Sequence, residues 1–251
     1  MTYFTKDEND LLQHYLQGAI ADLGEMALDL ATGTNLSECR TTYYEIPGHI
    51  VYPKTHDPEH CYLTPGNSFW VSFVDRGTAR PVVVAAHKVI ETRSLAGEIY
   101  THRAFGNLGP IIDTYDIGIQ DGLPQLAGRM GTTGGIVTHE DWQKRGLASQ
   151  IARVVQALSI RHFEIDYQFN FTIDSPERRR FVKNGYGIEH SVLATTGTTP
   201  INGKTVGVML NWSSRQEILG RMKRELDERK ARRLETAVDV GDLRHRAVQI
   251  A

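Results

Sequence analysis

The sequence of 251 residues has few cysteines, little net charge and no long hydrophobic run. Cys39 and Cys61 are too few for a disulfide framework and lack the spacing of metal ligands, so we expect no metal. A formal net charge of −2 provides no overall field that attracts nucleic acid or anionic membranes. No segment approaches the roughly 18 to 20 apolar residues of a membrane span, and the first residues lack the pattern of a secretory signal. These absences predict a cytoplasmic protein that binds neither nucleic acid nor membrane.

Two common phosphate-binding motifs are also absent. No GxxxxGK[ST] loop occurs, because Gly146 is followed by Leu147 and Ala148. The Gly-Thr-Thr-Gly-Gly run at 131–135 does not fit a GxGxxG motif that opens a helix. The sequence therefore disfavours P-loop nucleotide hydrolases and Rossmann dehydrogenases.

Hydrophobic periodicity predicts a mixed α/β chain. Its first half is expected to contain a helix at 6–31, extended segments at 41–65, a hairpin at 67–91 and a long Gly-rich connection at 93–129 with room for a short helix. Its second half is expected to contain a strand near 134–138, a helix at 149–163, an alternating strand at 165–173, a helix at 176–184, a hairpin within 188–212 and a charged helix at 214–235. We divide the chain into a main domain at 67–212, an N-terminal part at 1–66 that packs on or completes it, and a charged C-terminal part at 213–251.

The run Gln143–Ala148 lies where a strand should enter a helix. The first amides of a helix lack internal partners, and the helix dipole adds positive potential there, so such a junction suits a phosphate. Gly146 allows close approach to the backbone, while Lys144 and Arg145 add charged donors. The segment predicts an anion site, against the alternative of an ordinary basic helix start.

Two motifs resemble the GCN5-related N-acetyltransferases. Their signature Q/R-x-x-G-x-G/A is similar to Gln143–Ala148, and a second family segment of the form NEPAIRLYEKLGF is similar, without gaps, to 174–186. The motifs occur in the family's order, separated by a helix and a strand, and the resemblance covers roughly 67–212.

This resemblance implies a splayed, mostly antiparallel sheet flanked by helices, with additional helices at both ends of the chain. It also implies acetyl-CoA, or another acyl-CoA, as co-substrate, with the pantetheine arm on the fourth strand and the pyrophosphate on the loop. The residues that it assigns to the coenzyme are Ile136, Val137, Thr138, Gln143, Lys144, Arg145, Gly146, Leu147, Ala148, Ser149 and Asp174.

The chain departs from the family at three points. Phe181 stands where members often have the tyrosine that protonates the leaving thiolate, and Asp174 replaces an asparagine. The fourth strand offers no carboxylate or histidine as a base. The family also opens with a strand and two helices, for which 41–65 is too short and Pro-rich. Candidate bases lie in the long connection: Glu98, His102 and Asp116 foremost, with Asp113 and Tyr115.

We interpret the chain as an N-acyltransferase in which a primary amine attacks acetyl-CoA directly, without an acyl-enzyme. The acceptor is a small-molecule or protein amine, and a homodimer is an open alternative to a monomer. A longer-chain acyltransferase that uses acyl-CoA or an acyl carrier protein is the second enzyme reading. A non-catalytic acyl-CoA sensor is the alternative from another class.

Overall fold

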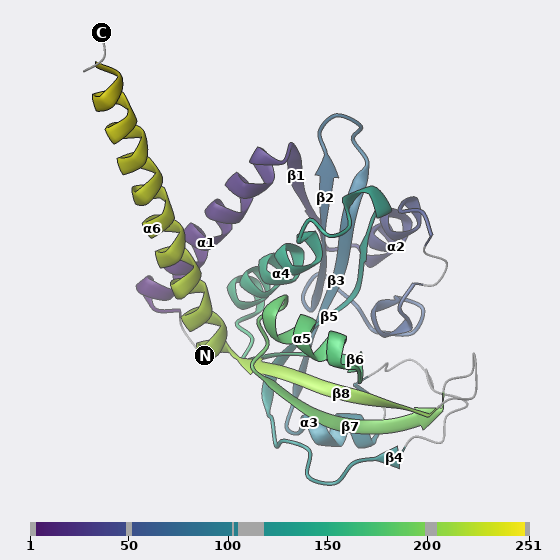
Figure 1. The fold of residues 1–251 in the computed structure, drawn as a ribbon. Coiled ribbons are helices and arrows are strands. Elements are labelled where there is room, and N and C mark those ends of the chain that lie inside the picture. Colours follow the sequence, from purple (N-terminus) through teal and green to yellow (C-terminus); the bar gives the residue numbers. More distant parts are fainter. Residues whose placement is uncertain (1–3, 49–51, 102, 105–117, 199–204, 249–251) are drawn as a thin grey trace.

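One eight-stranded sheet organises the chain (Figure 1). The computed structural model describes residues 4–48, 52–101, 103–104, 118–198 and 205–248; of 118, 196–198, 205–206 and 233–248 it describes the backbone alone. The strands are β1 (Leu28–Gly33), β2 (Ser68–Asp75), β3 (Pro81–Thr92), β4 (Gly118–Ile119), β5 (Gly128–Thr138), β6 (Tyr167–Ile173), β7 (His190–Thr198) and β8 (Thr205–Ser214). Their order is β1-β2-β3-β5-β6-β8-β7-β4, and only β5 and β6 pair in parallel.

Helices cover both faces of this sheet. They are α1 (Lys6–Glu25), α2 (Leu36–Glu45), α3 (Leu95–Tyr100), α4 (Leu147–Phe163), α5 (Pro176–Asn184) and α6 (Arg215–Val248), with 3-10 turns η1 (Lys54–His56) and η2 (Glu140–Trp142). Side chains alternate along β3, so Val83 and Ala85 pack with α1 and α4, whereas Val84 and Ala86 pack with α2. The predicted mixed, mostly antiparallel sheet with flanking helices and an additional helix at each end is confirmed.

Local sequence explains where the helices near the site begin. Thr5 caps α1 in a reciprocal box with Glu8, whose carboxylate accepts from the Thr5 amide at 3.0 Å. Ser175 caps α5 by accepting from the Arg178 amide at 3.2 Å, and Pro176 occupies the first turn. The predicted helix at 176–184 is confirmed.

The N-terminal third differs from the sequence prediction. The helix expected at 6–31 ends at Glu25, and Leu28–Gly33 form β1 at the sheet edge, antiparallel to β2. Ala27 adopts a left-handed φ of 55°, which stops the helix and turns the chain. The segment expected to be extended contributes α2 and η1 instead. Before its hairpin the described chain therefore contains a helix, a strand and a second α-helix.

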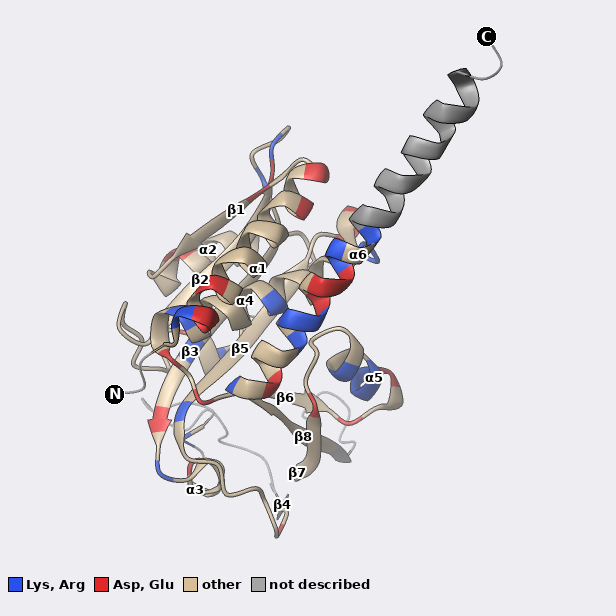
Figure 2. Ribbon diagram, turned by 90° about the vertical axis from the view of Figure 1, so that its left-hand side faces the viewer, with Lys and Arg blue, Asp and Glu red and all other residues tan. Residues whose placement is uncertain are grey.

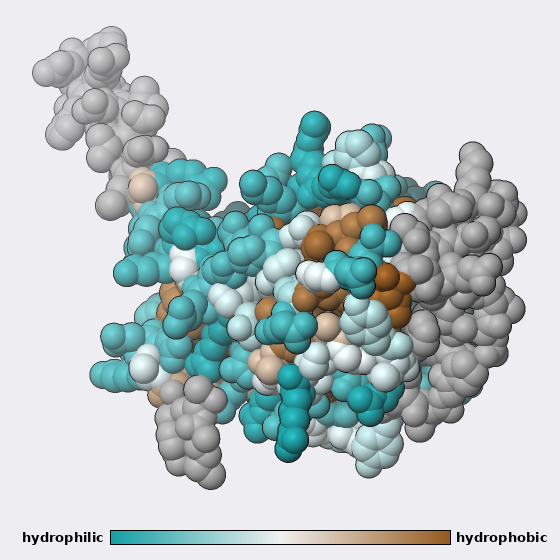
Figure 3. All heavy atoms as spheres, turned by 90° about the horizontal axis from the view of Figure 1, so that it is seen from below, coloured by the Kyte–Doolittle hydropathy of each residue, from teal (hydrophilic) through white to brown (hydrophobic). Residues whose placement is uncertain are grey.

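The helix at the C-terminal end is longer than the periodicity predicts. It runs to Val248, packs beside α1 in its first part, and then extends away from the sheet (Figure 1). Figure 2 shows basic and acidic positions mixed along the described part of α6, and several basic positions on α5. Seen from below, the described surface is largely hydrophilic, with one larger patch of apolar side chains and a few separate apolar residues (Figure 3). Among the described residues, no helix is both long enough and apolar enough to cross a membrane.

The sheet opens between its two parallel strands. β5 and β6 pair only at Met130–Thr132 and Tyr167–Phe169. Beyond that point β5 follows β3 to Thr138, and β6 follows β8 to Ile173. A bulge in the β3–β5 pairing, where Gly135 takes a φ of +63°, bends β5 in this same stretch. The divergence produces the splayed sheet and leaves an open cleft.

Candidate functional site

The loop between β5 and α4 exposes a row of backbone amides. Lys144 and Gly146 adopt left-handed φ angles of 62° and 80°, and Gly146 is the N-cap of α4 without any side-chain cap. The Ser149 and Gln150 amides both donate to the Gly146 carbonyl. Gln143 and Lys144 lie in a hydrogen-bonded turn, and within the described chain the amides of Gly146, Leu147 and Ala148 have no backbone acceptor. Consecutive free amides at the positive end of a 17-residue helix are the donors that an anion site requires.

The surroundings of this loop suit a ligand with two phosphates. A Cβ built on Gly146 would meet nothing within 4 Å, so the space beside the backbone is open. Lys144 and Arg145 are exposed, and the Arg145 guanidinium lies 4.6 Å from the centre of the Trp142 ring. Leu147 is buried in the core beneath the loop, so its contribution to a ligand is its amide. The structure thus brings the predicted residues Gln143–Ala148 together around one point.

The strand that leads into the loop has an unpaired edge. Val137 pairs with Val84 and Thr138 with Val83, so both residues are held by β3. From Thr133 to Thr138, no strand of the described chain pairs with the opposite edge of β5. The free backbone groups there can bind an extended, amide-containing arm in the manner of an added strand.

A cleft of about 170 Å³ lies between the splayed strands. Its walls come from β5, α4, β6 and the α5 region, and most side chains in it are polar or small. They are Thr133, Gly134, Gly135, Ile136, Ala152, Gln156, Gln168, Asn170, Phe171, Thr172, Arg178, Tyr186 and Ile188. Of the predicted strand residues Ile136, Val137 and Thr138, only Ile136 lines the cleft, while the other two continue β5 toward the anion loop.

Tyr186 is a cleft residue that sequence reasoning missed. Phe181, at the family's tyrosine position, packs edge-on against it with ring centres 4.8 Å apart. Burial raises the pKa of Tyr186, and the nearby Arg178 cation acts in the opposite direction. The Gly-Tyr pair that ends the second motif was the available signal. The cleft therefore contains a phenol, that of Tyr186, which lies five residues after Phe181 in the sequence.

Asp174 forms an ion pair with Arg179 of α5, the helix that follows it. Its carboxylate accepts hydrogen bonds from Nε and Nη2 of Arg179, the latter at 2.7 Å from Oδ2, and this pairing lowers the pKa of Asp174. It does not line the cleft. Its predicted contact with the coenzyme stays a prediction.

Of the three candidate bases, the described residues include Glu98. It lies on α3, accepts from Thr92 Oγ1 at 3.1 Å and pairs with Arg103 at 3.2 Å, and it does not line the cleft. His102 and Asp116, with Asp113 and Tyr115, lie outside the described residues. The role of each as a base stays a prediction.

A second cavity, of about 380 Å³, adjoins the same loop. Gly146, Ser149, Gln150 and Arg153 line it from α4, on the stripe of this helix that faces α1 and α6. From those helices come Tyr15, Asp22 and Arg229, the last two joined by an ion pair of 2.8 Å. Ser149, predicted to bind the coenzyme, thus lies beside the anion loop. The two cavities extend from α4 in different directions.

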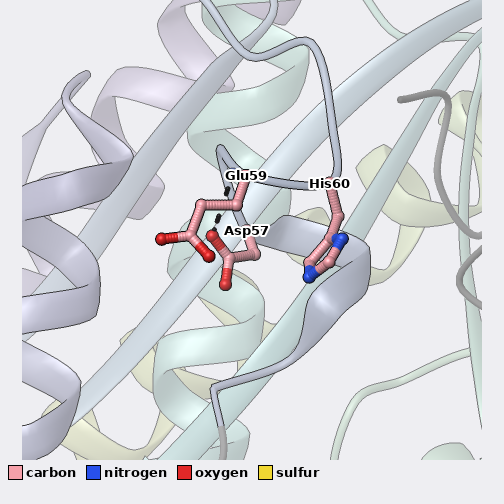
Figure 4. Close-up of side chains that lie close together, drawn as sticks. All are labelled: Asp57, Glu59 and His60. Carbon is pink, nitrogen blue, oxygen red and sulfur yellow. Dashed lines mark hydrogen bonds between the residues drawn. The ribbon is translucent and has the colours of Figure 1, made fainter. Parts of the chain in front are cut away.

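Asp57, Glu59 and His60 form a cluster with metal-ligand chemistry elsewhere (Figure 4). Their ligand atoms lie within 4.8 Å of one another, and the Glu59 amide donates to Asp57 at 3.0 Å. Arg40 lies 2.7 Å from Glu59 and 3.5 Å from Asp57. Because a fixed cation already compensates both carboxylates, the cluster is accounted for as a structural ion-pair network.

Coenzyme A matches this arrangement in chemistry. Its pyrophosphate requires clustered amide donors, which 146–148 provide, and its amide-containing arm requires an unpaired strand edge, which β5 provides. The described residues therefore fit the group that the sequence motifs imply.

Comparisons with known proteins find distant likenesses in structure. No protein-family model and no curated protein matches the chain. Arabidopsis thaliana NAA60 in complex with acetyl-CoA is 12% identical with a TM-score of 0.46, over 74% of this chain and 99% of that one. The ribosomal-protein-S5-alanine acetyltransferase of Vibrio fischeri is 13% identical with a TM-score of 0.43, over 75% and 93%. A spermidine N-acetyltransferase chimera from Vibrio cholerae and hSSAT is 11% identical with a TM-score of 0.43, over 77% and 99%. Likenesses this distant establish neither a family nor an activity, which must come from the geometry of the loop and cleft.

Proposed function

We propose that this chain is an N-acyltransferase of the GCN5-related kind that transfers an acetyl group from acetyl-CoA to a primary amine. The observation that supports it most strongly is the group of free amides at 146–148, which follows a strand whose outer edge is unpaired among the described residues. A basic helix start without a ligand would need no such combination of free donors, open strand edge and adjoining cleft.

The pyrophosphate binds the amides of the loop, and the side chains of Gln143, Lys144 and Arg145 surround it. The pantetheine arm follows β5 past Ile136, Val137 and Thr138 into the cleft. The nucleotide end lies in the 380 Å³ cavity beside Gly146, in which Arg229 and Asp22 present both signs of charge. The terminal helices α1 and α6 thereby complete the coenzyme site.

Transfer proceeds by direct attack of the amine on the thioester carbonyl. A backbone amide of β5 polarises the carbonyl oxygen as negative charge develops on it. The bond from nitrogen to the acyl carbon forms, the carbon–sulfur bond breaks, and the leaving thiolate takes a proton from the Tyr186 hydroxyl. Tyr186 thus assumes the acid role that Phe181 cannot perform. The base that removes the amine proton is one of Glu98, His102 and Asp116, as the sequence predicts.

Two alternatives make different predictions. A longer-chain acyltransferase would prefer long acyl thioesters over acetyl-CoA. A non-catalytic sensor, favoured by Phe181 at the family's tyrosine position, would bind coenzyme but release no thiol with any amine. The acceptor class, the cytoplasmic location, a homodimer and the independence from metal, nucleic acid and membrane remain proposals.

Calorimetric titration with acetyl-CoA and CoA tests the binding step. Micromolar affinity, about 8 kcal/mol, is the expected result. Release of free thiol from acetyl-CoA is then followed across a panel of small amines and peptides with free amino groups. Amine-dependent release identifies an enzyme, binding without release across the panel identifies a sensor, and no binding by either ligand refutes the proposal.

A further inference from the structure

Two polar side chains close the cleft where its strands meet. β5 and β6 separate just beyond Thr132 and Phe169, and there Thr133 and Gln168 both line the cleft. The Gln168 amide nitrogen donates to the Thr133 hydroxyl at 3.0 Å. Gln168 is only 2% exposed, so this pair forms the floor of the cleft.

Buried polar residues fix the floor from behind. His87 Nδ1 lies 3.0 Å from Thr133 Oγ1, and His87 Nε2 lies 2.7 Å from Ser159 Oγ. His87 and Ser159 are inaccessible to solvent, and burial lowers the pKa of His87, so its ring is neutral with one donor and one acceptor. A consistent chain of bonds runs from Gln168 through Thr133 and His87 to Ser159. Rotation of any member breaks a buried hydrogen bond, which makes the floor rigid.

The space beneath the floor is already filled. A Cβ on Gly131 would lie 2.7 Å from Gln168 Oε1, 2.9 Å from Ser159 Oγ and 3.0 Å from His87 Cε1. Only glycine leaves room for these three groups at this position. Gln168 Oε1 is buried without a hydrogen-bond partner in the described chain, and Ser159 and His87 occupy the space beside it.

We propose that Gln168, held by Thr133 and His87, limits the acyl group to acetyl. This inference rests on the proposed function and names the donor that the site selects. The cleft of about 170 Å³ must hold the thiol end of the arm together with the acyl group. A longer alkyl chain that continues toward the floor meets the amide of Gln168 and the hydroxyl of Thr133. Apolar atoms there would bury these polar groups without hydrogen bonds, which costs free energy. Selection against longer chains is therefore both steric and polar.

The test compares CoA, acetyl-CoA, butyryl-CoA and hexanoyl-CoA by calorimetry on three proteins. The wild type binds CoA and acetyl-CoA with similar affinity and butyryl-CoA at least tenfold more weakly. Gln168→Ala removes the floor side chain and brings butyryl-CoA to within threefold of acetyl-CoA, while CoA affinity stays within threefold of the wild type. Gln168→Met is the matched control, because it retains the length of the side chain and loses the amide, so it keeps the steric part of the discrimination and binds butyryl-CoA more weakly than Gln168→Ala does.

The outcomes separate this inference from the proposed function. Equal binding of acetyl-CoA and butyryl-CoA by the wild type overturns the inference and leaves the coenzyme site intact. Undiminished discrimination in Gln168→Ala also overturns it. Where the alanine variant does not fold, Gln168→Ser provides the same truncation with a polar group retained. If the wild type binds none of the four ligands, the proposed function fails and this inference with it.

Discussion

His87 Nε2 lies 2.7 Å from the hydroxyl oxygen of Ser159, and neither side chain is exposed to solvent. The pair joins β3 to α4 beneath the point where the sheet opens. A second buried histidine, His56, lies on the other side of β5 and contacts the Thr132 carbonyl at 3.1 Å. Neutral histidines therefore support β5 from both faces at the position that begins the cleft.

Acid should destabilise the fold through these two histidines. Burial lowers the pKa of His56 to about 3 and that of His87 well below its ordinary value. Below pH 6.5 the unfolded chain binds protons at both rings while the folded chain does not, so stability falls as pH falls from about 6.5 toward 3. Each ring contributes a slope of about 1.4 kcal/mol per pH unit in that window and nothing above it.

Urea unfolding at pH 7.5, 6.0, 5.0 and 4.5 measures this slope. His56→Gln should reduce the slope of unfolding free energy against pH by about 1.4 kcal/mol per pH unit, the contribution of one proton. His14→Gln, on the exposed side of α1, serves as the control. A His56→Gln slope equal to the wild-type slope would show that His56 is protonated in the folded state.

Gly146→Glu should abolish coenzyme binding. The new side chain enters open space beside the free amides, where it places bulk and negative charge at the position of the pyrophosphate. Gly122→Glu is a matched control, because Gly122 has the same φ of 80° and also has nothing within 4 Å of a built Cβ. Both variants lose about 1 to 2 kcal/mol of stability to the left-handed backbone.

Titration with acetyl-CoA distinguishes the two glycines. A loss of more than 100-fold in Gly146→Glu, with Gly122→Glu within threefold of wild type, is the expected pattern. Equal affinities in both variants would place the phosphate elsewhere.

Tyr186→Phe should lower kcat by about 10²-fold and leave the affinity for CoA within threefold. The variant retains the ring that packs on Phe181 and loses the one phenol that lines the cleft among the described residues. Adding Phe181→Tyr to this variant moves the hydroxyl to the family's position and should recover part of kcat. Steady-state assays of thiol release, with the amine identified in the panel, measure kcat of the single and the double variant. An unchanged kcat in Tyr186→Phe would assign the proton to water.

The loop and helix start at 143–148 could be predicted because local chemistry determines the backbone there, whereas its binding of an anion stays a prediction. Gln143–Ala148 and the Ser-Pro start of α5 encode their own backbone geometry through a glycine, a cap and a proline, whatever the rest of the chain does. The alternation along 165–173 likewise predicts β6, since its two sides meet different surroundings.

Other features depend on contacts between distant segments. Leu28–Gly33 read as the end of a helix because their apolar residues also suit a helical stripe, and only pairing with β2 selects the strand. The floor formed by Thr133 and Gln168 joins residues 35 positions apart, and His87 reaches it from a third strand. Tyr186 enters the cleft only because the segment after α5 returns to the splayed strands, where it meets residues of β5, α4 and β6. None of these contacts has a signature in a local sequence window.

Arg221 ties α6 to the cleft wall, so its loss should destabilise the whole fold. It is 7% exposed, and its guanidinium donates to the Gly187 carbonyl and to Gln156 Oε1, the latter at 2.6 Å. Arg221→Met keeps the apolar stem and leaves these buried acceptors without their cation, at a cost of about 3 to 5 kcal/mol. Arg224→Met, three residues further along the same helix and exposed, should stay within about 0.5 kcal/mol of wild type. Urea unfolding at pH 7.5 gives both values. Because Gln156 lines the cleft, Arg221→Met should also weaken acetyl-CoA binding. Equal stability of the two variants would show that the buried bonds of Arg221 do not stabilise the fold, and unchanged acetyl-CoA affinity would show that they do not position Gln156.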